Sequence, residues 1–336
     1  MKKRRWLLLG AAILAAGIVS SSVYADGYKS ELTNLEIDAS LRDQRPIAVM
    51  VDNESIALPH FGLAEGDVVY ELMNSTANNR ISRLMVILKD WGAINQMGCI
   101  RSVRTSNIPL AAEWNAILCH DGGPFYVDAY FAQPYAAQHF SGGFSRVNNG
   151  KAVEFTEFIL RGDLDAKFNQ TGFTRNYNDF APSDPTHFEF SDEEIDLSAR
   201  FGATAIPANE IALPFWHNSS MLRYDAASGT YDYYDYGSLH TDAEDGEVLS
   251  FKNVLLQDCV FEELDQNGYM NYQVVDSGRS GYYITNGKAI PVTWTKSSET
   301  DITRFYDLMG NEISINTGKT YIGLIPYDTW GNVTIQ

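Results

Sequence analysis

Four short runs of apolar residues in the first third of the chain constrain its fold more than any other feature. They occupy residues 46–51, 67–72, 83–88 and 116–120. Each run has about the length of one strand, and each lacks the polar alternation of a strand with one face in water. The four runs therefore predict a sheet that is covered on both faces.

The stretches between and after these runs favour helices. Residues 102–114 predict a helix, with Pro109 tolerable only near its first turn. An aromatic-rich segment at 123–140 and an acidic segment at 192–201 also have helical character. Buried strands that alternate with helices indicate an α/β layer, in which ligands commonly bind just past strand ends.

The second half of the chain, from about Ile211, has a different pattern. Short alternating runs are separated by the hairpin dipeptides Ser228-Gly229, Asn267-Gly268, Asn286-Gly287 and Gly310-Asn311. We therefore expect an α/β N-terminal domain at 46–210 with a largely buried sheet, and a smaller, antiparallel β-rich domain at 211–336. The whole chain would be α+β, with a tether at 26–45.

The first 25 residues have the composition of a signal peptide. Four basic residues at positions 2–5 precede an apolar core at 6–19, and small residues lead to Ala25, where we expect cleavage. An uncleaved anchor is the alternative, but the apolar core is shorter than the roughly 20 residues that span a bilayer. No cysteine stands at the cleavage point for a lipid anchor, and we expect no transmembrane segment after cleavage. These features predict a secreted protein at the extracellular face of the cell envelope.

The formal charge excludes several classes of partner. The chain has a net charge of −18, and removal of the leader, with its four basic and no acidic residues, makes it −22. A chain this acidic repels phosphate backbones, so we expect no nucleic acid partner.

The three cysteines do not form a disulfide framework. An exported chain with only Cys99, Cys119 and Cys259 is not a disulfide scaffold. Cys99 and Cys119 could pair, or all three could be isolated buried thiols. No cysteine or histidine spacing indicates a metal site, so none is assigned, and the cofactor is unknown.

Basic residues around position 100 form the best candidate binding site. If the predicted helix begins near Ser102, Arg101 and Arg104 stand three residues apart at its start, close to free backbone N–H groups. Such a combination binds carboxylate or phosphate oxygens. Arg83 begins a neighbouring strand and would complete an anion pocket. The alternative is that these arginines form structural salt bridges with acidic residues.

Polar residues that follow two predicted strands extend this candidate site. His120 is a candidate general acid or base, with Asp52 or Asp121 to orient it. Asn53, Gly122 and Gly123 occupy the same strand ends and are candidate ligand contacts. Ser102 is either a ligand contact, a helix cap or a nucleophile activated by His120.

Several motifs, in order along nearly the whole mature chain, resemble the YerB-like family, exported or lipoprotein-type proteins of Gram-positive bacteria with paired domains of unknown function. The motifs are RPIAVMVDN at 45–53, GDVVYE at 66–71, the Gly-x-x-Arg-Ser-x-Arg pattern at 98–104, HDGG at 120–123, TWTK at 293–296 and GKTYIGLIP at 318–326. Cys99 departs from the pattern, which usually has proline there. The resemblance implies an extracytoplasmic envelope setting and two domains, and it supplies no reaction.

Together these features predict a binding site for an anionic ligand, such as a cell-wall glycopolymer or a peptidoglycan fragment, at an arginine cluster beside a histidine. The alternative is a non-catalytic binding or assembly module, in which the arginines recognise a partner or form structural ion pairs. The tyrosines and Trp294 of the second half could stack on sugar rings, or they could pack in the core.

Overall fold

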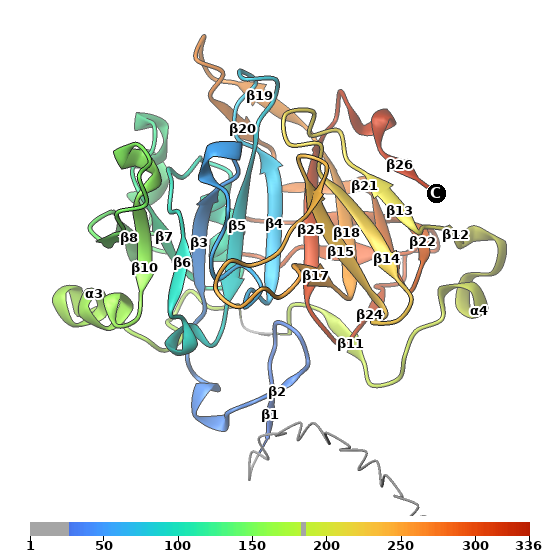
Figure 1. Ribbon diagram of the computed structural model, residues 1–336. Coiled ribbons are helices and arrows are strands. Elements are labelled where there is room, and N and C mark those ends of the chain that lie inside the picture. Colours follow the sequence, from blue (N-terminus) through green and yellow to red (C-terminus); the bar gives the residue numbers. More distant parts are fainter. Residues whose placement is uncertain (1–26, 183–185) are drawn as a thin grey trace, which may run out of the picture.

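A computed structural model describes residues 27–182 and 186–336; the expected signal peptide, residues 1–25, lies outside them. Within the described residues, the central feature is one sheet of eleven strands (Figure 1). The strands run in the order β12 (Ile206–Pro207), β22 (Lys288–Lys296), β21 (Asp276–Thr285), β18 (Asn253–Cys259), β25 (Thr320–Pro326), β4 (Val68–Met73), β5 (Ser82–Leu88), β3 (Ile47–Asp52), β7 (Ile117–His120) and β8 (His139–Ser141), with β23 (Arg304–Tyr306) paired to β22.

The four apolar runs of the first third are confirmed as strands β3, β4, β5 and β7 of this sheet. Every residue in these strands is buried. On β3, Ala48 and Met50 belong to one hydrophobic core, while Ile47, Val49 and Val51 belong to the other. A core on each face of the sheet explains why these runs lack polar alternation.

The two halves of the chain share the main sheet. Strand β25 pairs in parallel with β4 on one side and in parallel with β18 on the other. The second half therefore does not form only antiparallel pairs of its own, as expected, because β18 and β25 belong to the main sheet and pair in parallel. The fold class is confirmed as strand-dominated α+β with few helices, and the boundary near residue 211 stays a prediction.

A second sheet packs against the part of the main sheet that the second half supplies. Figure 1 shows it in front of β18 and β25, and the Tyr233 and Tyr321 rings meet there at 6.0 Å. Within the described residues its strands run in the order β16 (Ser238–Leu239), β15 (Thr230–Asp235), β14 (Met221–Asp225), β13 (Glu210–Ala212) and β26 (Thr334–Ile335), with β17 (Ser250–Phe251) paired to β15. The predicted turns are confirmed: Ser228-Gly229 joins β14 to β15, and Asn286-Gly287 joins β21 to β22.

Smaller sheets and short helices surround these two sheets. The small sheets pair β1 (Tyr28–Lys29) with β2 (Glu36–Ile37), β6 (Gln96–Gly98) with β10 (Glu157–Leu160) and β9 (Ser145–Arg146), β11 (Glu189–Ser191) with β24 (Ser314–Asn316), and β19 (Phe261–Glu263) with β20 (Met270–Tyr272). The helices are α1 (Asn107–Ala112), α2 (Asp128–Phe131), α3 (Asp163–Thr171) and α4 (Leu197–Phe201). The helix expected at 102–114 is thus only six residues long.

The residues expected to form a tether, 26–45, are folded against the body from residue 27 on. Leu32 is fully buried in the main core. Glu31 forms an ion pair of 2.5 Å with Lys89, whose side chain is almost completely buried. This segment is therefore part of the folded unit.

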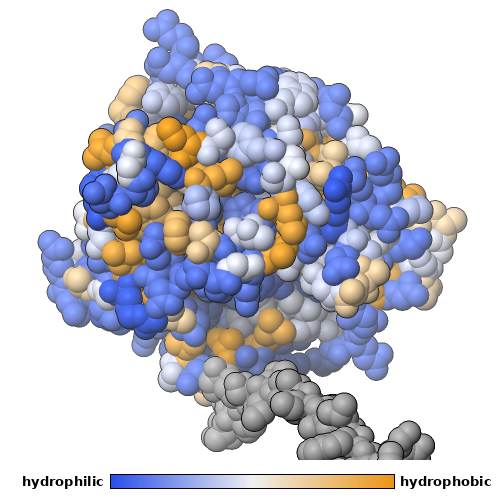
Figure 2. Space-filling model, viewed as in Figure 1, coloured by the Kyte–Doolittle hydropathy of each residue, from blue (hydrophilic) through white to orange (hydrophobic). Residues whose placement is uncertain are grey.

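The surface is largely hydrophilic in the view of Figure 2, where hydrophobic residues form small separate patches. Within residues 27–182 and 186–336, no helix has the length and hydrophobicity that a membrane span requires.

A buried ion pair joins the two halves on one face of the sheet. Glu113, just after α1, lies 3.0 Å from the Nζ atom of Lys296 on β22, and both side chains are fully buried. Thr303 donates to the same carboxylate from its backbone N–H and its hydroxyl. Burial alone would raise the pKa of Glu113, but the Lys296 ammonium holds it well below its usual range.

A second buried carboxylate joins the halves on the other face. Glu71 of β4 accepts hydrogen bonds from Ser82 in the first half and from Ser220, Tyr233 and Tyr321 in the second, at 2.5–3.0 Å. Burial raises the pKa of Glu71 in spite of these donors. The halves are therefore joined by polar groups that have no access to water.

Replacement of Lys296 with methionine should destabilise the protein by about 3–5 kcal/mol, because it leaves the Glu113 carboxylate buried without its counter-ion. Urea unfolding measures the loss. The matched control is Arg223→Met, which breaks an exposed pair with Glu210 and should cost at most about 1 kcal/mol. A loss below 1 kcal/mol for Lys296→Met would contradict a structural role for the buried pair.

Candidate functional site

An open cleft of about 540 Å³ lies at one end of the main sheet, where residues of both halves meet. Its volume is within the roughly 300–1,000 Å³ typical of small-ligand pockets. The first half lines it with the ends of strands and the loops that follow them, and the second half with the β19–β20 hairpin. The lining residues are Asp52, Glu54, Ile56, Asn74, Ser75, Ala77, Asn78, Ile81, Arg83, Arg101, Arg104, Phe155, Asn267 and Tyr269.

The hairpin from the second half is docked closely on the loop that follows β4, and Figure 1 shows the two side by side. The backbone N–H of Thr76 donates to the Gly268 carbonyl at 3.0 Å, and its hydroxyl donates to Glu263 at 2.6 Å. A side chain at Gly268 would lie 2.7 Å from the Ala77 nitrogen, and its φ of +77° also favours glycine. The Asn267-Gly268 turn therefore places Asn267 and Tyr269 at the cleft.

Asp52 is the counter-ion of two cleft arginines. It ends β3 directly opposite Arg83 on β5, and its carboxylate lies 3.5 Å from Arg83 Nη2 and 2.6 Å from Arg101 Nε. Burial alone would raise the pKa of Asp52, but the charges of Arg83 and Arg101 hold it below its usual range. Arg83 Nη1 also donates to the Ser102 carbonyl at 2.8 Å, so both terminal nitrogens of Arg83 are bonded to protein groups.

Arg104 differs from the other two arginines because it has no carboxylate partner among the described residues. Its Nε atom donates to the Asn74 carbonyl and its Nη1 atom to the Val103 carbonyl. The guanidinium lies over the Tyr269 ring at 5.0 Å. Burial, aided by the positive charge of Arg83, lowers the pKa of Arg104 to about 9. Its Nη2 atom has no hydrogen bond within the part of the chain that the structure describes.

Arg101 and Arg104 reach the cleft from the segment before helix α1 and not from a helix start. The backbone N–H of Arg101 donates to the Met50 carbonyl, and that of Val103 to the Gly122 carbonyl. These bonds tie the segment to neighbouring strand ends, so helix α1 begins only at Asn107. The expected contribution of free helical N–H groups was therefore wrong, although the predicted convergence of Arg83, Arg101 and Arg104 is seen.

His120 lies away from this cleft, so the predicted pairing of an arginine cluster with this histidine is not seen. The residue ends β7 and is 2 % exposed. Its Nδ1–H donates to the Gly122 carbonyl at 2.8 Å, and its Nε2 atom accepts from His139 at 2.9 Å. The ring stacks on Phe131, and burial lowers its pKa to about 4. Both ring nitrogens are thus occupied by protein groups.

The other predicted site residues are also used within the protein. The Asn53 side chain is fully buried and donates to the Ser82 hydroxyl near Glu71. Successive residues of a strand point to opposite faces, so Asn53 points away from the cleft that Asp52 lines. The Ser102 hydroxyl donates to the Asp121 carbonyl at 2.9 Å. The Asp121 carboxylate pairs with Arg146 at the surface.

Gly122 and Gly123 form a tight turn. Gly122 has a φ of +71°, and its carbonyl accepts from the backbone of Val103. A side chain at Gly123 would lie 3.0 Å from Val103. Neither glycine lines the cleft.

Comparison with known families covers most of the chain. Residues 32–174 match the N-terminal domain, and residues 211–322 the C-terminal domain, of the family described as "Protein of unknown function (DUF3048)". The chain belongs to the DUF3048 family.

Individual relatives of this DUF3048 chain agree with that assignment. The protein named "Putative lipoprotein YerB" of Bacillus subtilis (strain 168) is 24 % identical over 312 residues, which cover 91 % of this chain and 86 % of that protein. The crystal structure of YerB protein from Bacillus subtilis has a TM-score of 0.76 at 20 % identity, and the match covers 92 % of this chain and 99 % of that one. The resemblance seen in the sequence motifs is thereby confirmed, and the fold is shared.

The three cysteines of this DUF3048 chain are free and buried. The alternative of isolated thiols is confirmed, and no bond joins Cys99 to Cys119. Burial raises the pKa of the Cys99 thiol to about 12 and that of Cys119 further. These cysteines are therefore poor nucleophiles.

The cleft residues that the sequence did not indicate include three amides and one tyrosine: Asn74, Asn78, Asn267 and Tyr269. Asn74 follows β4 directly, as the predicted site residue Asn53 follows β3. The same rule would have found it. Asn267 and Tyr269 belong to a hairpin that the Asn267-Gly268 dipeptide did predict, but no sequence signal tells which loop a hairpin contacts.

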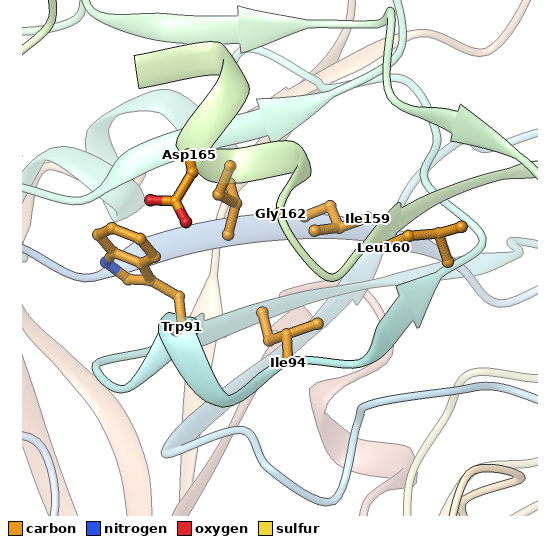
Figure 3. Close-up of a pocket in the computed structure, with 8 residues that line it drawn as sticks. Trp91, Ile94, Ile159, Leu160, Gly162 and Asp165 are labelled. Atoms are coloured by element: carbon orange, nitrogen blue, oxygen red, sulfur yellow. The ribbon is translucent and has the colours of Figure 1, made fainter. Parts of the chain in front are cut away.

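Three other pockets within the described residues each hold about 20 Å³ or less. The pocket in Figure 3, between Trp91, Ile94, Ile159 and Asp165, holds about 20 Å³. That space accepts about one water molecule. Among residues 27–182 and 186–336, no three histidine, cysteine or acidic side chains gather as a metal site.

A buried pair of histidines, His60 and His240, contacts the backbone of the cleft residue Asp52. The Nε2–H of His60 donates to the Asp52 carbonyl at 2.6 Å, so its Nδ1 accepts from His240 Nε2 at 2.8 Å. His60 comes from the first half and His240 from the second. Burial lowers the pKa of His60 to about 4, and burial together with nearby His60 lowers that of His240 to about 3. Both rings are therefore neutral in the folded protein.

The contribution of His60 and His240 to the free energy of unfolding should fall as the pH is lowered from about 6.5 to 4. In this range the unfolded chain binds protons at these histidines and the folded chain does not, a loss on the order of 3 kcal/mol for His60 alone. Denaturant unfolding across this pH range measures the slope. His60→Gln should remove this contribution, so the variant should lose less stability than the wild type as the pH falls. A slope unchanged by His60→Gln would contradict the neutral buried ring.

Proposed function

We propose that this DUF3048 protein binds an anionic ligand in the cleft through Arg101 and Arg104. The observation that carries the proposal is the unpaired Nη2 atom of Arg104 in a cleft of ligand size. Arg101 supports it, because its Nε donates to Asp52 and its Nη1 to the Glu154 carbonyl, while its Nη2 has no hydrogen bond within the described residues. Two guanidinium donors are thus available to carboxylate or phosphate oxygens.

The local charge supports an anion although the chain as a whole is acidic. Arg83, Arg101 and Arg104 line the cleft, and Asp52 is shared by the first two. Glu54, the other acidic residue of the lining, lies 3.0 Å from His217. An anion beside Arg104 would compensate the unfavourable burial of its charge.

The proposed place of action is the extracellular face of the cell envelope. The relative's printed name describes a lipoprotein, and residues 1–25 of this chain have the pattern of a signal peptide. Cleavage after Ala25 stays a prediction. The proposed ligands are therefore a cell-wall glycopolymer or a peptidoglycan fragment, which occur there and carry anionic groups.

An alternative function is a non-catalytic binding or assembly module in which the same arginines recognise a partner protein. The structural ion-pair alternative is favoured for Arg83 alone, because Asp52 and the Ser102 carbonyl occupy its terminal nitrogens. The catalytic roles expected of His120, Asp52 and Asp121 are not part of this proposal, because His120 lies outside the cleft and both carboxylates form ion pairs with arginines.

Calorimetric titration with N-acetylmuramic acid, which carries one carboxylate on an amino sugar, tests the proposal. Neutral N-acetylglucosamine is the matched ligand. The wild type should prefer the acidic sugar, and Arg104→Gln should weaken its binding at least tenfold, the loss expected for one charge-assisted contact. A parallel titration with glycerol 3-phosphate shows whether the site prefers phosphate or carboxylate.

The matched control is Arg223→Gln, a surface arginine outside the cleft that should leave the affinity unchanged. Far-UV circular dichroism verifies that each variant is folded. Equal binding of acidic and neutral sugars, or wild-type affinity in both Arg101→Gln and Arg104→Gln, would overturn the proposal.

A further inference from the structure

Trp216 is an exposed aromatic residue beside the mouth of the cleft. It lies in the turn between β13 and β14, and 48 % of it is exposed. The guanidinium of Arg80 lies over its ring at 5.5 Å, two residues after the cleft residue Asn78. The next residue, His217, contacts Glu54, another cleft residue, at 3.0 Å. Trp216 therefore adjoins the cleft between two of its lining segments.

The turn holds Trp216 in a defined position. Phe215, directly before Trp216, and Asn218, two residues after it, are both buried. The backbone N–H groups of Asn218 and Ser219 donate to the Phe215 carbonyl. The Asn218 side chain accepts from the backbone of Ser82 at 2.9 Å, which fixes the turn to the first half. A ring held in place loses little conformational entropy when a ligand stacks on it.

The partner of the Trp216 ring is also fixed. Both terminal nitrogens of Arg80 bind Asp328, at 2.8 and 2.6 Å, and its guanidinium also lies over the Phe261 ring at 5.8 Å. Arg80 is thus occupied by Asp328 and supports the tryptophan, so a ligand here would meet the exposed part of the Trp216 ring.

We propose that Trp216 is a sugar-binding subsite that extends the cleft, so that the protein binds a glycan chain and not only a single anionic sugar. One sugar ring packs on Trp216, and the anionic group of a neighbouring sugar lies at Arg101 and Arg104. This inference rests on the proposed function and names its ligand as polymeric. The C–H face of a sugar ring packs on the negative face of an aromatic ring.

Polar residues of the cleft favour a glycan over an apolar partner. Asn78 and Asn267 are exposed cleft amides, and each offers both donors and an acceptor to sugar hydroxyls. The Glu54–His217 pair makes this part of the rim polar as well. Trp294, the tryptophan expected to stack on sugars, is 1 % exposed and donates to the Asp258 carbonyl, so it belongs to the core.

Titration with two probes of different length tests the inference. The probes are N-acetylmuramic acid and a tetrasaccharide of alternating N-acetylglucosamine and N-acetylmuramic acid. The wild type should bind the tetrasaccharide more tightly, and Trp216→Ala should remove roughly three- to tenfold of its affinity without change for the monosaccharide. Trp216→Phe keeps an aromatic face and should retain most of the affinity. Phe180→Ala, an exposed aromatic outside the cleft, is the control.

The outcomes separate the two proposals. Equal wild-type affinity for both probes, or tetrasaccharide binding unchanged by Trp216→Ala, would overturn the subsite while the anion site remains. An equal loss for both probes would also overturn it, because Trp216 would then act on the cleft as a whole. Loss of tetrasaccharide affinity in Trp216→Ala but not in Arg104→Gln would support the subsite and contradict the anion site.

Discussion

The parallel pairing of β4 with β25 is the interaction on which the rest of this structure depends. Strand β4 belongs to the first half of the chain and β25 lies near its end. Because this pairing joins the halves in one sheet, the β19–β20 hairpin and the Trp216 turn are placed against loops of the first half. Glu71 and Glu113 reinforce the junction from opposite faces, each with partners in the second half. The cleft exists because two segments of distant sequence meet there.

The distribution of charge in the cleft follows from one shared carboxylate. Asp52 pairs with both Arg83 and Arg101, so the buried charge of Arg83 is compensated and Arg101 is oriented. Arg104 receives only carbonyl acceptors and the face of Tyr269. Two positive charges therefore remain in excess among these four groups. A cluster that looks uniform in the sequence thus divides into a structural arginine and two that are available to a ligand.

The sequence predicted the strands of the first half well, because a run of consecutive apolar residues has few alternatives to a strand covered on both faces. It predicted the turn at Asn286-Gly287 for a similar reason, since both residues adopt positive φ angles with little strain. The helix at 102–114 was overestimated because the backbone of residues 101–103 bonds to neighbouring strand ends, which are long-range contacts. Local sequence does not encode such contacts.

The site was predictable only in part, for reasons of direction and distance. Asp52 and His120 were both singled out because they stand at the end of a predicted strand. Only Asp52 faces the cleft. The periodicity of a strand does not tell which residue at its end will be hydrogen-bonded by neighbouring protein groups. His139, which donates a hydrogen bond to the Nε2 atom of His120, comes from another strand of the sheet. No sequence motif pointed to Trp216. The turn buries Phe215 and Asn218 and leaves the Trp216 side chain between them exposed. These relations appear only when the elements are assembled.

The central claim is that Arg101 and Arg104 are available to an anion while Arg83 and His120 are not. Side-chain NMR of the arginine Nε–H groups and the histidine rings, followed during titration with N-acetylmuramic acid, tests it most directly. The account predicts saturable shifts for Arg104 and Arg101, with little change at Arg83 and none at His120. Shifts that are largest at Arg83 or His120, or absent from Arg104, would contradict it.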